Sequence, residues 1–343
     1  MSLPYIFGCQ STSLSREERK FFTDTQPLGF ILFKRNCVNK RQVKDLVKNL
    51  RSCIKHWAPV LIDQEGGRVQ RLTAPIWRSA PAAAIFEEVW QLKPEVAKEL
   101  VFLNARLIAD ELFDLGIDVN CAPVVDLKEP NASCIIGDRA FSSDPEIAAI
   151  LGRSAIDGFE NGGVAPILKH IPGHGRAEVD SHFALPRISS EISALIKRDF
   201  KTFLALNDCK AAMTGHLLFS QIDQINPVTT SSIIINKFIR MHINFQGLLI
   251  SDDLSMEALS GSLSQRATEA LSAGCDIGLH CSGRLDEMVE IACANLQFNE
   301  SSEIRIDTFL SQIKRLKKNR ENINYETTML MFNEKLARAR AGH

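Results

Sequence analysis

The sequence lacks the features of membrane and nucleic-acid-binding proteins. No stretch approaches the ~20 apolar residues of a membrane-spanning helix, and the opening MSLPYIFGCQ has neither the basic region nor the apolar run of a signal peptide. The formal net charge is −1, so a polyanion or a membrane surface is not expected as the main ligand. The basic stretch 314–320 follows Ile313 and contains Leu316, as a solvated amphipathic helix would. We therefore expect neither a nucleic-acid nor a membrane partner.

Signals for disulfide pairing are also missing. The chain has nine cysteines, an odd count, and no C-x-x-C occurs among them. An oxidising compartment would leave at least one thiol unpaired, so a reduced compartment is the simpler explanation. We expect a cytoplasmic protein, and with no sign of an oligomer, a monomer.

Short apolar runs alternate with longer amphipathic segments through most of the chain. The runs are short and mostly apolar, as strands buried on both faces of a parallel sheet are. They span residues 5–8, 29–33, 60–63, 117–126, 166–170, 210–216, 247–252 and 275–281. Eight such runs favour an α/β fold closed into a (β/α)8 TIM barrel. The alternative, an open doubly wound sheet, usually carries G-x-G-x-x-G after its first strand, and residues 8–11 have no such motif.

The clearest helix is predicted from Pro94 to Leu115, because its leucines recur every three or four residues. Pro94 suits the first turn, and Gly116 suits the residue after the helix. Further helices are predicted over residues 151–158, 190–206, 231–241, 255–273 and 284–296. No linker divides the chain. We therefore expect residues 1–343 to form a single domain, with residues 302–343 as terminal helices packed on the barrel.

Ionisable residues end five of the predicted strands. In a (β/α)8 barrel the carboxyl ends of all strands open onto one face, which holds the catalytic groups. One such residue would commonly cap a helix. Burying five ionisable side chains at one rim costs free energy, which favours a functional role for them. The five are Asp63, Asp126, His170, His216 and Asp252.

The segment K-H-I-P-G-H-G at 169–175, followed by Asp180-Ser181-His182, is the most specific feature. Its proline and glycines predict a loop, so His170 and His174 do not share a helix face as zinc-binding histidines four residues apart would. Three of the chain's eight histidines lie within these thirteen residues, which an incidental surface turn would not explain. No metal and no cofactor are expected.

Two other strand ends suggest sugar recognition and a carboxylate pair. Residues 61–71 deliver Asp63 and then arginines, and a carboxylate that accepts beside a guanidinium that donates suits sugar hydroxyls. Arg139, in the loop 136–141, could reach the same rim. At Asp252-Asp253, alternation along the strand allows at most one side chain to point into the barrel mouth. Asp253 is expected to cap or begin the next helix.

These segments, in this order, closely resemble the β-N-acetylhexosaminidases of glycoside hydrolase family 3, nearest to the short bacterial enzymes of peptidoglycan recycling. The resemblance runs from about residue 29 to 282 and is strongest in K-H-I-P-G-H-G…D-S-H, D-Q-E-G-G-R-V-Q-R and S-D-D-L-S-M. Met213-Thr214-Gly215-His216 departs from it, with Gly where the family commonly has Ala. The resemblance implies a retaining exo-β-N-acetylglucosaminidase that removes N-acetylglucosamine from GlcNAc-1,6-anhydro-MurNAc-peptides through a covalent glycosyl-enzyme intermediate.

The resemblance also implies roles for individual residues. Asp252 would be the nucleophile and His182 the acid/base, with Asp180 as its partner; an imidazole can give and take a proton near neutrality. Sugar-binding positions carry over to Asp63, Arg71, Arg139, Lys169 and His170.

Three other activities suit parts of the pattern. An imidazole acid/base repels anions less than a carboxylate does, so a phosphorylase on the same scaffold is one alternative. A metal-dependent barrel hydrolase is a second, although the first strand lacks the H-x-H such enzymes carry. A non-catalytic sugar-binding module would need aromatic platforms, and the chain has only three Trp and two Tyr.

Overall fold

The computed structural model describes residues 2–129, 135–181 and 183–341, and its main element is a parallel sheet. In these ranges the hydrogen-bonded strand order is β5-β4-β3-β2-β1-β11-β10-β8-β6. The strands are β1 (Leu3–Gly8), β2 (Pro27–Leu32), β3 (Val60–Ile62), β4 (Val119–Asn120), β5 (Ala165–Pro166), β6 (Leu168–Ile171), β8 (Ala211–Thr214), β10 (Leu248–Asp253) and β11 (Ile277–His280). A separate pair joins β7 (Arg187–Ile188) to β9 (Leu218–Phe219).

The sheet closes on itself. β5 and β6 stand at opposite ends of the strand order, yet only Ile167 separates them in the chain. Ala165 pairs with Val119 on one side, and Leu168 pairs with Ala212 on the other. One stretch of chain therefore completes both edges, and the eight predicted runs supply the eight positions of a closed barrel. The predicted (β/α)8 fold is confirmed.

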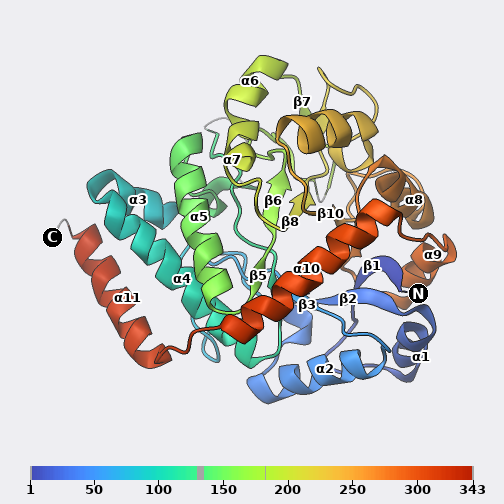
Figure 1. Ribbon diagram of the computed structural model, residues 1–343, viewed down its shortest axis with the longest axis horizontal. Helices are drawn as coiled ribbons and strands as arrows, with labels where there is room; N and C mark the ends of the chain where they lie inside the picture. The colour runs from blue at the N-terminus through green and yellow to red at the C-terminus, as the bar shows by residue number, and fades with distance from the viewer. Residues whose placement is uncertain (1, 130–134, 182, 342–343) are drawn as a thin grey trace.

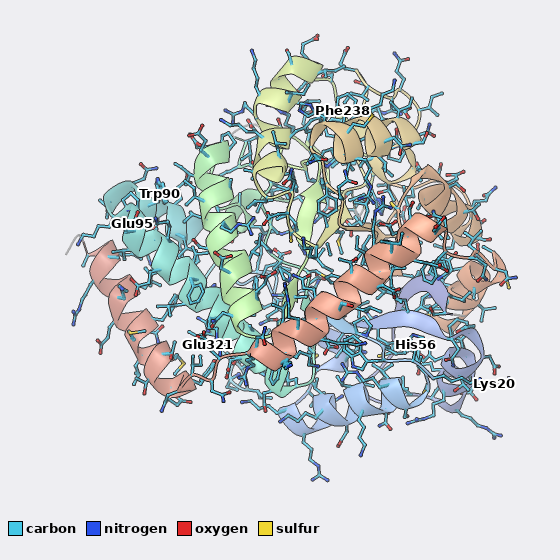
Figure 2. The ribbon with its side chains drawn as sticks, viewed as in Figure 1. Lys20, His56, Trp90, Glu95, Phe238 and Glu321 are labelled. Carbon is cyan, nitrogen blue, oxygen red and sulfur yellow. The ribbon has the colours of Figure 1, made fainter. Side chains whose placement is uncertain are left out.

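Helices surround the strands (Figure 1). They are α1 (Arg16–Thr25), α2 (Lys40–Ser52), α3 (Ala84–Leu92), α4 (Pro94–Asp114), α5 (Pro145–Asn161), α6 (Ile192–Lys197), α7 (Asp199–Ala205), the π-helix η4 (Ile234–His242), α8 (Leu263–Ala273) and α9 (Leu285–Cys293), with 3₁₀ turns η1 (Lys34–Asn36), η2 (Gly137–Arg139) and η3 (Val228–Thr230). Charged side chains such as Lys20 on α1 and Glu95 on α4 lie on the outside (Figure 2). Pro94 begins α4 and Gly116 follows it at φ +78°, as predicted.

The predicted helix 255–273 is wrong in its first third. α8 begins only at Leu263, where Ser262 and Gln265 form a reciprocal capping box. The residues between β10 and Ser262 form turns instead, so Asp253 neither caps a helix nor lies in a first turn. The helix predicted over 190–206 is divided into α6 and α7 at Arg198.

Helix α10 (Glu300–Asn319) closes the amino-terminal end of the barrel and crosses in front of the strands in Figure 1. Its Phe309 and Ile313 are buried among barrel-interior side chains such as Leu61. Two buried aspartates hold it there. Asp118, just before β4, accepts Lys317 Nζ at 2.6 Å, and Asp276, just before β11, accepts Arg305 Nη1 at 3.0 Å. The opposite end is therefore the open mouth.

Helix α11 (Tyr325–Arg340) packs against α3 and α4 rather than against the barrel strands. With α10 it occupies the segment in which terminal helices were predicted. Among the described residues, no helix has both the length and the apolar character needed to cross a bilayer.

The α10 plug leads to a stability prediction. Phe309→Ala should lower the free energy of unfolding by about 3–5 kcal/mol, because it removes a buried ring and leaves a cavity at the barrel base. Ile304→Ala on the same helix is the control, since Ile304 is 61% exposed and should change stability by less than ~0.5 kcal/mol. Denaturant unfolding of both variants makes the comparison. Equal losses would mean that α10 does not plug the core.

Candidate active site

A cleft that encloses about 940 Å³, open solvent at its mouth included, lies at the carboxyl ends of the strands. It gathers ionisable groups from β3, β6 and β10 and from the loops that follow them. Lining side chains include Asp63, Glu65, Arg71, Arg139, Lys169, His170, His174, Asp180, Ser181, Asp252 and Asp253. Most residues predicted for the site thus meet in one place. His182 lies outside the described residues, so its role stays a prediction.

A buried ion-pair network forms one wall of the cleft. Lys169, 3% exposed, donates from Nζ to Asp63 Oδ1 at 2.9 Å and lies 2.6 Å from Glu65 Oε1. Arg71 donates from Nη2 to Asp63 Oδ2 at 3.0 Å. Arg139 donates from Nε and Nη2 to the two carboxylate oxygens of Glu65, at 2.8 and 2.9 Å. Three cations therefore share two carboxylates at the ends of β3 and β6.

These contacts set the charge state of the network. Burial alone would raise the pKa of both carboxyls, but Lys169 with its arginine partners outweighs burial, holding Glu65 at about 2 and Asp63 well below its usual range. The carboxylates in turn raise the pKa of Lys169 against the effect of burial. All these groups are therefore charged at neutral pH. Arg71 still has a buried Nε without a partner among the described residues, and its guanidinium lies over the Phe33 ring at 4.8 Å.

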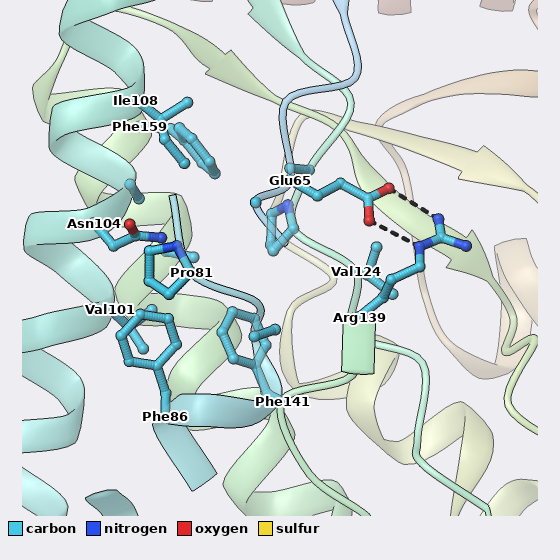
Figure 3. Close-up of a pocket in the computed structure, with 16 residues that line it drawn as sticks. Glu65, Pro81, Phe86, Val101, Asn104, Ile108, Val124, Arg139, Phe141 and Phe159 are labelled. Carbon is cyan, nitrogen blue, oxygen red and sulfur yellow. Dashed lines mark hydrogen bonds and ion pairs between the residues drawn. The ribbon is translucent and has the colours of Figure 1, made fainter. Parts of the chain in front are cut away.

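A second cavity of about 460 Å³ lies behind the pair of Glu65 and Arg139 (Figure 3). Apart from that pair its lining is mostly apolar, with rings such as Phe86, Phe141 and Phe159. Among the described residues, the cleft brings many more polar groups together than this cavity does, so we assign the chemistry to the cleft.

Asp126 organises the loop after β6. Its buried carboxylate accepts the backbone N–H of His174 at 2.7 Å and of His170 at 3.1 Å, and it lies 2.6 Å from His170 Nδ1. Because that carboxylate only accepts, His170 carries its proton on Nδ1 and keeps Nε2 for a ligand. His174 is buried nearby, and burial lowers its pKa to about 4, so its ring is neutral.

β10 carries an irregularity that overturns the expectation of strict side-chain alternation. Ile250 pairs with Ile277 but Asp253 pairs with Leu279, so β10 has one extra residue, and Ser251 Oγ accepts the Leu279 N–H at 2.9 Å. As a result both Asp252 and Asp253 line the cleft. Their carboxylates are used differently.

Asp253 is fully engaged within the protein. Its carboxylate accepts Ser255 N, Ser255 Oγ and Cys281 N at 3.0, 2.7 and 3.1 Å. Asp252 accepts only the Asp253 N–H, at 2.8 Å on Oδ1, and its Oδ2 has no hydrogen-bond partner in the described ranges. Burial raises the pKa of Asp252, but His216, His170 and that N–H lower it below its ordinary value overall. Asp252 is therefore an ionised carboxylate with one oxygen available.

The loop carrying Asp180 and Ser181 covers another side of the cleft. Its first part is held by Arg176, which donates to Asp199 at 2.8 Å, and by Gly175, where a Cβ would lie 2.3 Å from the Leu127 carbonyl oxygen. Ser181 is buried, and its carbonyl accepts the Ala258 N–H at 3.3 Å. The loop backbone thus docks beside the turn that follows Asp252 and Asp253.

Sequence reasoning missed two residues of this site. Glu65 was not proposed, although D-Q-E places it two positions after Asp63, on the same side of an extended chain. His216 was seen only as a strand end. In the structure it lies behind Asp253, with Nε2 2.9 Å from the Asp253 carbonyl oxygen. Within the described ranges, no three His, Cys, Asp or Glu side chains group to hold a metal ion.

Comparison with known proteins confirms the resemblance seen in the motifs. The model of the glycosyl hydrolase family 3 N-terminal domain matches residues 7–318. The chain is 37% identical over 282 residues to a β-hexosaminidase of Alkalilimnicola ehrlichii, covering 81% of this chain and 80% of that protein. It is 36% identical over 289 residues to a β-hexosaminidase of Pseudomonas aeruginosa, covering 83% and 84%.

Solved structures agree. NagZ of Neisseria gonorrhoeae in complex with N-trifluoroacetyl-D-glucosamine superposes with a TM-score of 0.84 at 29% identity, covering 99% of this chain and 98% of that one. A glycoside hydrolase family 3 β-N-acetylglucosaminidase of Paenibacillus gives a TM-score of 0.83 at 29% identity, covering 97% and 67%.

The ion-pair wall predicts a pH-dependent stability loss. Lys169→Met should cost about 3–5 kcal/mol at pH 7, because two buried carboxylates lose their shared ammonium. Glu65 has a depressed pKa of about 2, so its pairs stabilise the fold above its unfolded pKa of about 4.5, and that stability is lost as pH falls towards 2. The difference in unfolding free energy between wild type and Lys169→Met should therefore become smaller as the pH falls below about 4.5.

Urea unfolding from pH 7 to pH 3 measures that gap. Lys44→Met is the matched control, because Lys44 forms an exposed pair with Asp114 at 2.8 Å and should cost at most ~1 kcal/mol. If the stability lost in Lys169→Met stays constant with pH, or equals the loss in Lys44→Met, Lys169 does not stabilise the fold by neutralising the two buried carboxylates.

Proposed function

Since the chain belongs to glycoside hydrolase family 3 and is a glycosidase of the β-hexosaminidase type, we propose that it is a retaining exo-β-N-acetylglucosaminidase. One observation carries the proposal: Asp252 presents an ionised carboxylate with Oδ2 available, in a cleft whose other wall is a charged polar network. A carboxylate held in this way is suited to attack an anomeric carbon.

The reaction proceeds in two balanced steps. Asp252 Oδ2 attacks C1 of the sugar, the bond from C1 to the leaving oxygen breaks, and that oxygen takes a proton from His182, which Asp180 orients. Water then attacks C1 of the glycosyl ester and gives its proton to His182, which regenerates the carboxylate and retains the anomeric configuration. No other group is needed to balance either step.

The sugar would be held by Asp63, Arg71, Arg139, Lys169 and His170. Asp63 remains the acceptor for hydroxyl groups, since its pairing with Lys169 and Arg71 keeps it ionised. Among the described residues, Arg71 Nε is a buried donor without a partner, and His170, whose Nδ1 faces Asp126, can accept at Nε2. The network thus offers both kinds of hydrogen bond to sugar hydroxyls.

The natural substrate would be GlcNAc-1,6-anhydro-MurNAc-peptides from peptidoglycan recycling, handled by one catalytic domain of residues 1–343. This substrate fits the similarity to NagZ over nearly the whole chain. We also infer that the enzyme works in the cytoplasm as a monomer on a carbohydrate alone. The odd number of cysteines supports that location.

Asp252→Ala should abolish turnover of an aryl β-N-acetylglucosaminide, because no other carboxylate can form the glycosyl ester. An activated 2-fluoro glycoside should label wild-type Asp252 as an ester that peptide mass spectrometry locates. Binding of N-acetylglucosamine should survive the substitution. Labelling of another residue would refute the assignment, and sugar 1-phosphate as the main product in phosphate buffer would indicate phosphorolysis instead.

His182→Ala should depend on the leaving group. A poor leaving group needs the proton that His182 supplies, so its kcat/KM should fall by about 10²–10⁴-fold, whereas a dinitrophenyl glycoside should lose far less in the first step. Steady-state kinetics on both substrates tests this, with azide added to rescue the second step. Equal losses on both substrates would exclude His182 as the acid.

A further inference from the structure

His216 is fully buried immediately behind the proposed nucleophile. It follows β8 at the carboxyl end of the barrel, and its exposed fraction is 0%. Its Nε2 lies 2.9 Å from the Asp253 carbonyl oxygen, and its Nδ1 lies 2.7 Å from Thr229 Oγ1. Thr229 Oγ1 lies 2.8 Å from Thr214 Oγ1. These side chains join the ends of β8, η3 and β10.

Only one arrangement of protons satisfies this chain of contacts when the ring is neutral. A carbonyl oxygen only accepts, so Nε2 must carry the proton. Nδ1 then accepts from the Thr229 hydroxyl, whose oxygen accepts in turn from the Thr214 hydroxyl. Burial lowers the pKa of His216, which keeps the ring neutral at neutral pH. The Asp253 carbonyl therefore fixes the tautomer of His216, and the two threonines hold the ring in its orientation.

The backbone that His216 contacts has little freedom left. The Asp253 side chain is tied to Ser255 and to Cys281 N, and the next residue, Leu254, donates its N–H to the Leu279 carbonyl at 2.8 Å. Two groups restrain the Asp253 carbonyl: the Met256 N–H donates to it at 3.1 Å, and His216 approaches it with its side chain. With the carbonyl, side chain and following peptide all held, the Asp253 N–H points at Asp252 Oδ1, 2.8 Å away.

We propose that His216 is a positioning residue for the nucleophile: it fixes the Asp253 backbone, so that the Asp253 N–H holds Asp252 Oδ1 and leaves Oδ2 directed at the substrate. This inference rests on the proposed role of Asp252. It assigns a function to Asp253 as well, through its backbone rather than its carboxylate. It also explains why two carboxylates stand side by side while only one has an available oxygen.

The consequence for the reaction is specific to the attacking step. A nucleophile displaced by a fraction of an ångström attacks every substrate more slowly, whatever its leaving group.

The experiment compares four variants of the full chain. His216→Leu removes the hydrogen bond to Asp253, and His216→Gln keeps a donor. Thr229→Val removes the hydroxyl that holds Nδ1 of the ring, without touching Asp253. Thr202→Val is the matched control, because Thr202 is equally buried on α7 and its hydroxyl has no partner in the described ranges. Each is assayed with a dinitrophenyl and a poor-leaving-group β-N-acetylglucosaminide, and for its rate of trapping by the 2-fluoro glycoside.

His216→Leu should lower kcat/KM about 10- to 100-fold on both substrates and slow trapping equally. Thr229→Val should lower kcat/KM roughly 3- to 10-fold. His216→Gln should recover part of the kcat/KM that His216→Leu loses, and Thr202→Val should match wild type. Folded His216→Leu and Thr229→Val proteins with wild-type kinetics, or losses confined to the poor leaving group, would overturn the inference. Asp252→Ala runs in parallel: if it still turns over, the proposed function itself fails, whereas an inactive Asp252→Ala beside a fully active His216→Leu removes only the role of His216.

Discussion

The active-site wall depends on one ammonium group placed between two buried carboxylates. Lys169 Nζ lies 2.9 Å from Asp63 and 2.6 Å from Glu65, and without it those largely buried carboxylates would repel each other. Arg139 and Arg71 can approach only because the carboxylates stay ionised. The network therefore forms as a unit, and it presents fixed charges and oriented donors before any sugar arrives.

The two ends of the barrel use the same interaction for different purposes. At the amino-terminal end, Asp118 and Asp276 hold α10 over the apolar interior, and their partners are fully engaged within the protein. At the carboxyl end, Asp252 and Arg71 each keep an atom that has no hydrogen-bond partner among the described residues. Buried charge that is completely paired stabilises a particular packing, while buried charge left partly unpaired favours a ligand. This difference, rather than the number of charges, marks the functional end.

Strand positions followed from the sequence because burial on both faces makes each run apolar throughout, and the residues at their ends then identified Asp63, His170 and Asp252. Errors arose where a local feature overrode periodicity. The apolar residues after Asp253 suggested a helix, but they pack beneath a turn. The start of α8 is instead marked by the capping residues Ser262 and Gln265. Alternation failed at Asp252 because one extra residue in β10 shifts the register. No periodic pattern encodes such a bulge.

That extra residue links the fold to the chemistry. A regular strand would turn Asp252 and Asp253 to opposite faces, and only one could reach the cleft. With the bulge, Asp253 can tie its carboxylate to β11 and its carbonyl to His216 while its N–H faces Asp252. The ladder bond lost at the irregularity is replaced by the Ser251 hydroxyl. The three residues of the S-D-D sequence therefore have different roles. Ser251 restores a hydrogen bond of the sheet, Asp253 supports the backbone, and Asp252 keeps a carboxylate oxygen that has no hydrogen-bond partner among the described residues.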